Sequence, residues 1–214
     1  MVILGLTGSI AMGKSTAAQA LRRLGLPVHD ADAEVHRLLA EDKAAIAAVR
    51  KAFPKAVKAG RVDRAALGAA VFDHPAALRR LEAILHPRVR RAEARFLRRQ
   101  ARRRAPLVVL DIPLLYETGA EVRCDAVLVV SAPAFIQAQR VLRRPGMSAQ
   151  RLAAIRARQV PDAEKRRRAD FVIPTGQGRG ASLRALKRAV RKMQGRAGRH
   201  WPPRRRRASG ARHA

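Results

Sequence analysis

The sequence is short of several residue types, and each shortage narrows what the protein can do. Cys124 is the only cysteine among 214 residues, so neither an intramolecular disulfide nor a cysteine-based zinc cluster can form, which fits a reducing compartment. Aromatic residues make up 3% of the chain, too few for the stacking platforms that bind single-stranded nucleic acids. Asparagine is absent, which excludes the Asn-Lys-x-Asp motif that recognises guanine. No apolar stretch approaches the roughly 20 residues that span a bilayer, so we expect no membrane insertion. No charged region precedes the short N-terminal apolar run, so we expect no export and a cytoplasmic location.

Acidic residues are also scarce: 46 Lys and Arg stand against 16 Asp and Glu, a formal net charge of +30. The excess is uneven, because the chain from Phe171 onward holds 13 basic residues and no acidic one. Residues 195–214, with Pro202-Pro203 and the run Arg204–Arg207, carry too little apolar content to bury a core, which predicts a disordered basic tail. We expect no specific nucleic-acid site, only weak nonspecific binding by this tail. The alternative from a different class is a nucleic-acid-binding protein whose affinity falls steeply with salt.

A phosphate-binding pattern lies near the N-terminus. Residues 8–15, Gly-Ser-Ile-Ala-Met-Gly-Lys-Ser, follow an apolar run and match G-x-x-x-x-G-K-[ST] between a predicted strand and a predicted helix. The glycines let backbone N–H groups surround a phosphate, and the helix adds the positive end of its dipole. Lys14 is expected to neutralise the β/γ-phosphates and Ser15 to bind Mg²⁺. The pattern predicts a nucleotide-binding loop made of Gly8, Ala11, Met12, Gly13, Lys14, Ser15 and Thr16, and the missing guanine motif favours ATP.

Short apolar runs predict five strands, over residues 2–7, 27–30, 107–111, 126–130 and 170–173. Because these runs are nearly continuous rather than alternating, we expect strands buried on both faces, as in a parallel sheet between helices. The predicted fold class is a three-layer α/β P-loop NTPase core with a five-stranded parallel sheet.

The long connection between the second and third predicted strands, residues 31–106, predicts helix throughout and hence an inserted helical subdomain. Asp63 and His74-Pro75 indicate helix starts, since proline is harmless in a first turn. Pro87 is expected to break or kink the run.

Carboxylates follow the second and third predicted strands, where an open α/β sheet binds its ligands. Asp30 and Asp32 close the second strand, Asp111 closes the third, and Glu117 follows in the next loop. We expect them to converge near Lys14, where any of them could serve Mg²⁺ or a hydroxyl group. A helix N-cap is the alternative role for Asp30 or Asp32. With ATP as the nucleotide and one compact core, a kinase of a small metabolite is the leading class.

The chain resembles one family closely, the dephospho-coenzyme A kinases. The similar segments span about residues 2–192 and comprise 5–16, 30–36, 85–87, 111–117, 140–144 and 156–159. The resemblance implies phosphorylation of the ribose 3′-hydroxyl of dephospho-coenzyme A by ATP and Mg²⁺, giving coenzyme A and ADP in the last step of coenzyme A synthesis. The alternative enzyme is another P-loop kinase of metabolites or nucleosides, with a different acceptor.

The resemblance also implies roles for single residues. Asp32, the second aspartate of Asp-x-Asp, matches the family's essential aspartate and is the expected base toward the ribose hydroxyl. Lys14 and Arg140 would offset charge on the phosphates, and Arg144 is a weaker candidate for nucleotide binding. The candidates for substrate binding are Asp30, His86, Asp111 and Glu117, with a structural role as the alternative for His86.

One P-loop kinase domain is expected over residues 1–194. It would comprise a core of residues 1–34 and 106–194, a helical insert of about 35–105 that holds the acceptor, and a helical lid of about 140–165. The lid would exclude water from the phosphates, with Pro145-Gly146 marking a turn between its helices.

Ala11 departs from the family pattern, which usually has glycine at this position. The methyl group of Ala11 adds bulk beside the phosphates and disfavours a positive φ, so nucleotide affinity could fall slightly without loss of activity.

Overall fold

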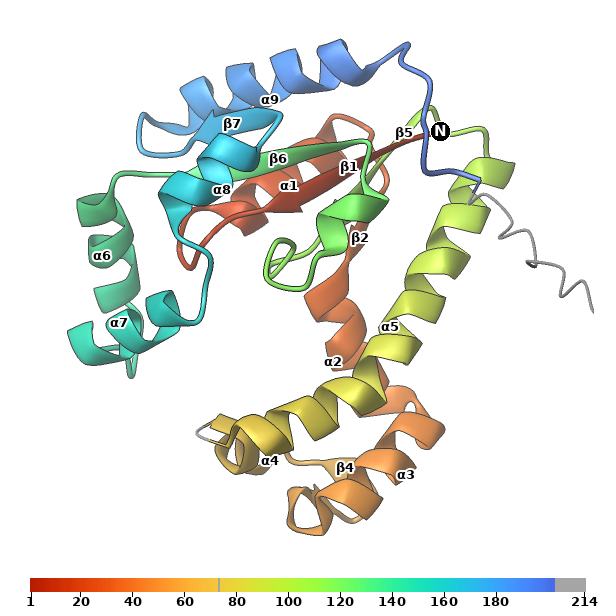
Figure 1. The fold of residues 1–214 in the computed structure, drawn as a ribbon, viewed down its shortest axis with the longest axis vertical. Coiled ribbons are helices and arrows are strands. Elements are labelled where there is room, and N and C mark those ends of the chain that lie inside the picture. Colours follow the sequence, from red (N-terminus) through yellow and green to blue (C-terminus); the bar gives the residue numbers. More distant parts are fainter. Residues whose placement is uncertain (73, 203–214) are drawn as a thin grey trace, which may run out of the picture. The chain divides into compact units, whose positions relative to one another are not determined.

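The computed structural model describes residues 1–72 and 74–202 (Figure 1). The chain divides into two compact units. The first, here called the sheet unit, combines Met1–Val28 with the chain from Arg104 onward, and the second, the inserted unit, is His29–Arg103. This division puts Asp30 and Asp32 with the inserted helices, although the sequence placed them at the end of the core.

A five-stranded sheet forms the centre of the sheet unit. Its strands lie in the order β2-β5-β1-β6-β7, and β1 pairs in parallel with both β5 and β6. The bounds are β1 Val2–Thr7, β2 Val28–Asp30, β5 Leu107–Asp111, β6 Ala126–Ser131 and β7 Phe171–Pro174. Every residue of β1, β5 and β6 is buried, which explains why their apolar runs do not alternate. The predicted α/β class with a five-stranded parallel sheet is confirmed.

Helices and a long loop cover the two faces of this sheet. On one face α1 (Lys14–Arg23) and α9 (Arg179–Met193) share an apolar core with the sheet, and Figure 1 shows α9 lying over β7. On the other face the loop after β5 packs so closely that a side chain at Gly5 would meet Leu115 and Cys124. The remaining helices are η2 Ala120–Arg123, α6 Ala134–Leu142, α7 Ala149–Ala157 and α8 Asp162–Arg168. The end of α6 and the start of α7 agree with the turn predicted at Pro145-Gly146.

The inserted unit consists mainly of helices around its own apolar core. Its elements are α2 Ala31–Glu41, α3 Lys43–Ala52, η1 Pro54–Ala56, β3 Val57–Lys58, β4 Arg61–Val62, α4 Arg64–Phe72 and α5 Pro75–Arg102. Buried side chains from α2 to α5 form the core, namely Leu39, Val49, Ala56, Leu67, Leu81 and Leu85.

One expectation for the inserted unit is corrected and another is narrowed. The segment is not helical throughout, because β3 and β4 form an antiparallel hairpin whose turn residues Ala59 and Gly60 both have positive φ, 47° and 75°. Of the two outcomes expected at Pro87, a break or a kink, the break does not occur, since α5 continues through it. Proline removes one helical hydrogen bond, and the buried residues that follow, including Phe96 and Leu97, hold the rest of α5 in place.

The predicted helix starts at Asp63 and at His74-Pro75 are confirmed. Asp63 accepts hydrogen bonds from the amides of Ala65 and Ala66, each 3.0 Å long, and the Ala66 bond in particular lowers the pKa of its carboxyl. His74 is the N-cap of α5, and Pro75 occupies the first turn, where no amide donor is needed.

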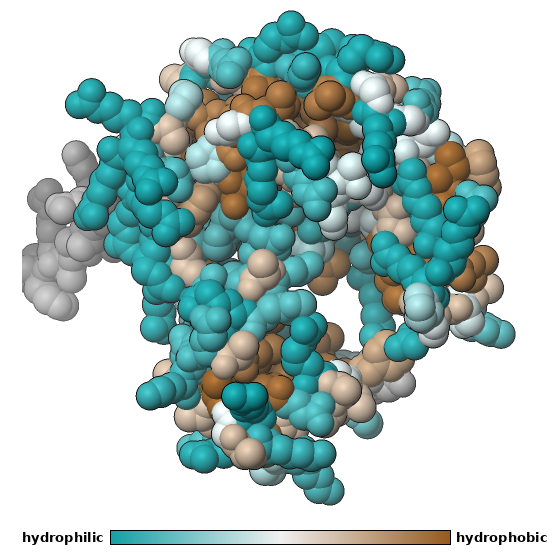
Figure 2. Space-filling view, turned by 180° about the vertical axis from the view of Figure 1, so that it is seen from behind, coloured by the Kyte–Doolittle hydropathy of each residue, from teal (hydrophilic) through white to brown (hydrophobic). Residues whose placement is uncertain are grey.

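The chain carries a large excess of basic residues, 46 Lys and Arg against 16 Asp and Glu. Figure 2 shows hydrophilic side chains over most of the visible face. Of the basic tail, residues 195–202 are placed, with the Arg199 amide donating to Asp125 Oδ1 at 2.6 Å, whereas residues 203–214 lie outside the described part of the chain. None of the described helices has the length and apolar character needed to cross a membrane.

Candidate active site around the phosphate-binding loop

The loop between β1 and α1 is built around two glycines. A side chain at Gly8 would overlap the Val130 side chain and approach the Val130 carbonyl oxygen to 2.8 Å, so only glycine fits against β6. Gly13 immediately precedes α1 with φ 89°, a left-handed conformation that glycine adopts without strain. Ser15 and Thr16 lie exposed in the first turn of α1. The loop therefore takes the strand-to-helix form that its sequence predicts, with the predicted metal ligand Ser15 open to solvent.

Ala11 adopts the conformation that its methyl group disfavours. Its φ is 57°, in the left-handed region, which costs an L-residue about 1–2 kcal/mol relative to the right-handed form. A hydrogen bond stabilises this conformation, because the Ala11 carbonyl oxygen accepts from Arg140 Nη1 at 3.3 Å. The conformation that glycine would favour is thus present although the glycine is not.

Lys14 and Asp111 meet beside the loop. Their Nζ and Oδ1 atoms are 2.9 Å apart, and Asp111 is only 1% exposed. Parallel pairing explains the contact, since Asp111 ends β5 in register with Leu6 of β1, one residue before the chain turns toward the loop. The structure therefore brings together the predicted phosphate-binding lysine and one predicted carboxylate. A buried carboxylate at this distance holds the ammonium group in place when no phosphate is bound.

Arg140 on α6 reaches the loop from the side of β7. Besides Ala11 it contacts Thr175, with Nη2 donating to the carbonyl oxygen at 2.6 Å and Nη1 to Oγ1 at 3.3 Å. Thr175 Oγ1 in turn lies 2.8 Å from the Met12 carbonyl oxygen, and Thr175 follows the carboxyl end of β7. The predicted cation therefore braces the loop backbone. Arg144 lies exposed in the turn after α6.

Two glutamines bind the phosphate-binding loop at Ile10. The Ile10 amide donates to Gln159 Oε1 at 3.2 Å, and the Ile10 carbonyl oxygen accepts from Gln137 Nε2 at 3.0 Å. Gln137 belongs to α6 and Gln159 to the connection between α7 and α8. Residues before and after α7 thus contact the same residue of the phosphate-binding loop.

Glu117 is engaged by a buried lysine that the sequence did not single out. Lys165 Nζ, on α8, lies 2.7 Å from Glu117 Oε1, and the Lys165 side chain is fully buried. The contact is ionic without a well-directed hydrogen bond. The same oxygen accepts a hydrogen bond from the Val160 amide at 2.9 Å. Glu117 therefore joins the loop after β5 to the residue that follows Gln159.

Sequence reasoning missed Thr175, Gln137 and Lys165, and it named Gln159 only as part of the family-like segment 156–159, without a role. Thr175 had a usable signal, because it follows the last predicted parallel strand, at the edge where such sheets bind ligands. Gln137 lies within helix α6, where nothing in the sequence distinguishes it from a surface residue. Lys165 opens a run of four basic residues that resembles a solvated helix face.

Three predicted site residues belong to the inserted unit. Asp30 is the N-cap of α2 and accepts a hydrogen bond from the Ala33 amide at 2.9 Å, as its alternative role predicted. Asp32 lies exposed in the first turn of α2. His86 is exposed on α5. A carboxylate in this position can accept a proton from a hydroxyl group that binds within hydrogen-bond reach.

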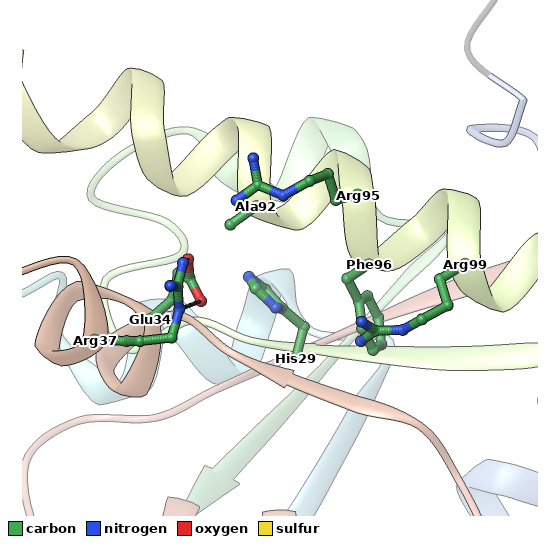
Figure 3. Close-up of a pocket in the computed structure, with 7 residues that line it drawn as sticks. All are labelled: His29, Glu34, Arg37, Ala92, Arg95, Phe96 and Arg99. Atoms are coloured by element: carbon green, nitrogen blue, oxygen red, sulfur yellow. Dashed lines mark hydrogen bonds and ion pairs between the residues drawn. The ribbon is translucent and has the colours of Figure 1, made fainter. Parts of the chain in front are cut away.

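The inserted unit also contains a basic pocket of about 330 Å³ between α2 and α5 (Figure 3). Its charged and aromatic lining consists of His29, Glu34, Arg37, Arg95, Phe96 and Arg99, and Ala92 completes it. Glu34 and Arg37 form a two-point ion pair, with Nη2–Oε1 and Nε–Oε2 distances of 2.6 and 3.2 Å. This pairing with Glu34 raises the pKa of Arg37 above its ordinary value.

Known proteins match this chain over most of its length. A family model described as dephospho-CoA kinase matches residues 2–178. The dephospho-CoA kinase of Rhodospirillum rubrum is 62% identical over 187 residues, which cover 87% of this chain and 89% of that protein. The dephospho-CoA kinase of Paramagnetospirillum magneticum is 66% identical over 195 residues, covering 91% and 92%.

Solved structures agree. The crystal structure of TT1252 from Thermus thermophilus has a TM-score of 0.78 and 42% identity, covering 91% of this chain and 98% of that one. The dephospho-CoA kinase from Campylobacter jejuni shares the fold, with a TM-score of 0.61 at 24% identity over 90% of this chain and 97% of that one. The resemblance carried by the motifs is confirmed, and the chain belongs to the dephospho-CoA kinase family.

Proposed function

We propose that this protein transfers the γ-phosphoryl group of ATP to the ribose 3′-hydroxyl of dephospho-coenzyme A, giving coenzyme A and ADP. Family membership supports the reaction, and the Lys14–Asp111 pair beside the phosphate-binding loop is the observation that carries it. A lysine held 2.9 Å from a buried carboxylate is positioned before the nucleotide arrives. The triphosphate then offers Lys14 a more highly charged partner.

The loop and its braces bind and orient the phosphates. Backbone amides at the start of α1 donate to phosphate oxygens, and the helix dipole adds positive potential there. Arg140 acts at the same place through Ala11 and Thr175, and its guanidinium can grip phosphate oxygens at two points. Together these groups offset the charge that develops as the phosphoryl group moves.

Mg²⁺ fits this site as a phosphate-bound ion. Ser15 offers an exposed hydroxyl group beside Lys14, and oxygen ligands of this kind suit Mg²⁺. Within residues 1–72 and 74–202 no group of three or more His, Cys, Asp or Glu side chains could hold a metal ion by itself. We assign Ser15 as the residue that would hold the ion, together with phosphate oxygens of the nucleotide. The ion would neutralise charge on the β- and γ-phosphates.

The inserted unit supplies the acceptor side of the reaction in this proposal. Asp32 takes the proton of the ribose hydroxyl as the phosphoryl group moves, because the hydroxyl is a poor nucleophile at neutral pH. Asp30 fixes the start of α2 through its bond to Ala33 and so holds the helix turn that carries Asp32. We also propose a cytoplasmic location, since the sequence contains a single cysteine, Cys124, and so has no intramolecular disulfide, which fits a reducing compartment.

The test is ADP release from ATP and Mg²⁺, measured with and without dephospho-coenzyme A. Release should depend on the acceptor and be lost in Asp32→Asn and Lys14→Ala proteins. Glu41→Gln, an exposed carboxylate change at the far end of α2, is the matched control and should leave the rate unchanged. ADP release at the same rate with and without dephospho-coenzyme A would contradict the proposal. The same assay with nucleosides, other small metabolites and RNA would then identify the alternative.

A further inference from the structure

We propose that the basic pocket of the inserted unit is a second anion site, which binds a multiply charged phosphate compound of the size of inorganic diphosphate. The pocket lies entirely within His29–Arg103, between α2 and the C-terminal half of α5. Its volume of about 330 Å³ is at the small end of the range for ligand pockets, which favours a compact ligand.

The charges in the pocket do not balance. Three guanidinium groups line it, and Glu34 is the one carboxylate among the lining residues. Glu34 pairs with Arg37 at two points, which fixes both side chains on the α2 wall. Across residues 1–72 and 74–202, neither Arg95 nor Arg99 forms an ion pair with a carboxylate. Two positive charges are therefore left for a ligand.

Arg95 and Arg99 are one turn apart on α5, a spacing at which like charges on a helix repel each other. A phosphate compound between them would relieve this repulsion. Each guanidinium can donate two parallel hydrogen bonds to phosphate oxygens, which a lysine cannot do.

The back of the pocket is rigid and aromatic. His29 and Phe96 are 9% and 7% exposed, with ring centroids 5.2 Å apart and planes at 32°. The Arg99 guanidinium lies over the Phe96 ring, 5.9 Å from its centroid, which restricts where Arg99 can point. Figure 3 shows Arg37 and Glu34 on one wall and Arg99 beside Phe96 on the other, with His29 between them. Arg37 and Arg99 are thus restrained before a ligand binds.

Helix geometry separates this pocket from the proposed base. An α-helix turns about 100° per residue, so Asp32 points about 160° away from Glu34 and about 140° away from Arg37 around α2. A ligand among Glu34, Arg37 and the α5 arginines therefore lies on the face of α2 opposite to Asp32. It would bridge α2 to α5 without touching the carboxylate assigned to the phosphoryl acceptor.

Calorimetric titration of the full-length protein with inorganic diphosphate tests the site. The phosphate-binding loop would also take diphosphate, so the protein is first saturated with ADP and Mg²⁺. We expect saturable binding to one site, weakened at least tenfold in the Arg95→Ala/Arg99→Ala double variant. The Arg91→Ala/Arg98→Ala variant removes two exposed arginines from the same helix outside the pocket and should bind within twofold of the unmodified protein.

Three results would overturn the proposal. ADP-saturated protein that fails to bind diphosphate has no second site. Equal weakening in both double variants would mean that only the overall charge of α5 is sensed. Displacement of diphosphate by saturating dephospho-coenzyme A, measured in Asp32→Asn protein to prevent turnover, would make the pocket part of the acceptor site. The ADP-release assay decides the proposed reaction separately, so the two proposals fail independently.

Discussion

Replacing Lys165 with methionine should destabilise the protein strongly. Methionine is flexible and similar in length, so it can fill the buried space on α8 while the charge disappears. The Glu117 carboxylate, whose side chain is 12% exposed, then remains charged and largely buried without the Lys165 ammonium group beside it. Breaking a buried pair in this way costs about 3–5 kcal/mol. In a protein of this size 1 kcal/mol shifts Tm by about 2–4 °C, so we expect a fall of roughly 6–20 °C.

Thermal unfolding followed by circular dichroism measures this effect, and ATP affinity provides a second readout. Glu117 holds the Val160 amide, and the preceding residue, Gln159, holds the Ile10 amide in the phosphate-binding loop. Loosening this connection should raise KM for ATP more than KM for dephospho-coenzyme A. A change confined to general stability would instead leave both constants unchanged below the melting range.

Two variants make the reasoning refutable. Glu117→Gln combined with Lys165→Met removes the stranded charge and keeps an Oε1 acceptor for the Val160 amide, so it should regain at least half of the lost Tm. Arg166→Met removes an exposed neighbouring charge and should change the free energy of unfolding by less than about 0.5 kcal/mol. A Lys165→Met protein that melts within 2 °C of the original, or a double variant no more stable than the single one, contradicts the argument.

The other predictions concern the loop and its surroundings. Ala11→Gly should raise Tm slightly and leave turnover within twofold of the original. Glycine relieves about 1–2 kcal/mol of strain from the left-handed conformation, which exceeds the roughly 0.4–1 kcal/mol that its greater freedom in the unfolded chain costs. A large rise in turnover would disprove this. Asp111→Asn should lower kcat/KM for ATP by roughly tenfold or more, because Lys14 loses the buried carboxylate that positions it beside the loop before ATP binds, and steady-state rates equal to the original would refute it. Burial raises the pKa of the Tyr116 hydroxyl to about 12, whereas a tyrosine in the unfolded chain has a pKa near 10. The neutral form of Tyr116 therefore contributes fully to the free energy of unfolding below about pH 10. This contribution is lost as the pH rises toward 12. Tyr116→Phe should therefore flatten the fall in Tm between pH 10 and 12, and an unchanged slope would count against the assignment.

The sheet was predictable because its signal is local. Strands buried on both faces need continuous apolar runs, and each of the five runs lies within one residue of its strand. The hairpin of β3 and β4 was not predictable in this way, since strands of two residues show no periodicity. Its alanine-rich surroundings favour helix, and only the positive φ of Ala59 and Gly60 redirects the chain.

The candidate site was predictable only where chemistry and sequence spacing coincide. The phosphate-binding loop is contiguous, and Asp111 ends a strand next to β1, so both follow from the chain itself. Lys165 depends on a partner 48 positions earlier in the chain, and its burial is decided by how α8 packs. A run of basic residues gives no sign of which member turns inward.

Glu117 follows a strand end where ligands bind, but its contacts indicate a structural role. The sequence placed it among substrate-binding candidates because it follows β5, yet a carboxylate facing phosphates would repel them unless its charge were compensated. Lys165 provides that compensation at 2.7 Å, and the Val160 amide uses the same oxygen. The arrangement favours action through the backbone, from Glu117 to Val160 and from Gln159 to Ile10. On this basis the contribution of Glu117 lies in orienting the loop that binds ATP, and its loss should affect the nucleotide before the acceptor.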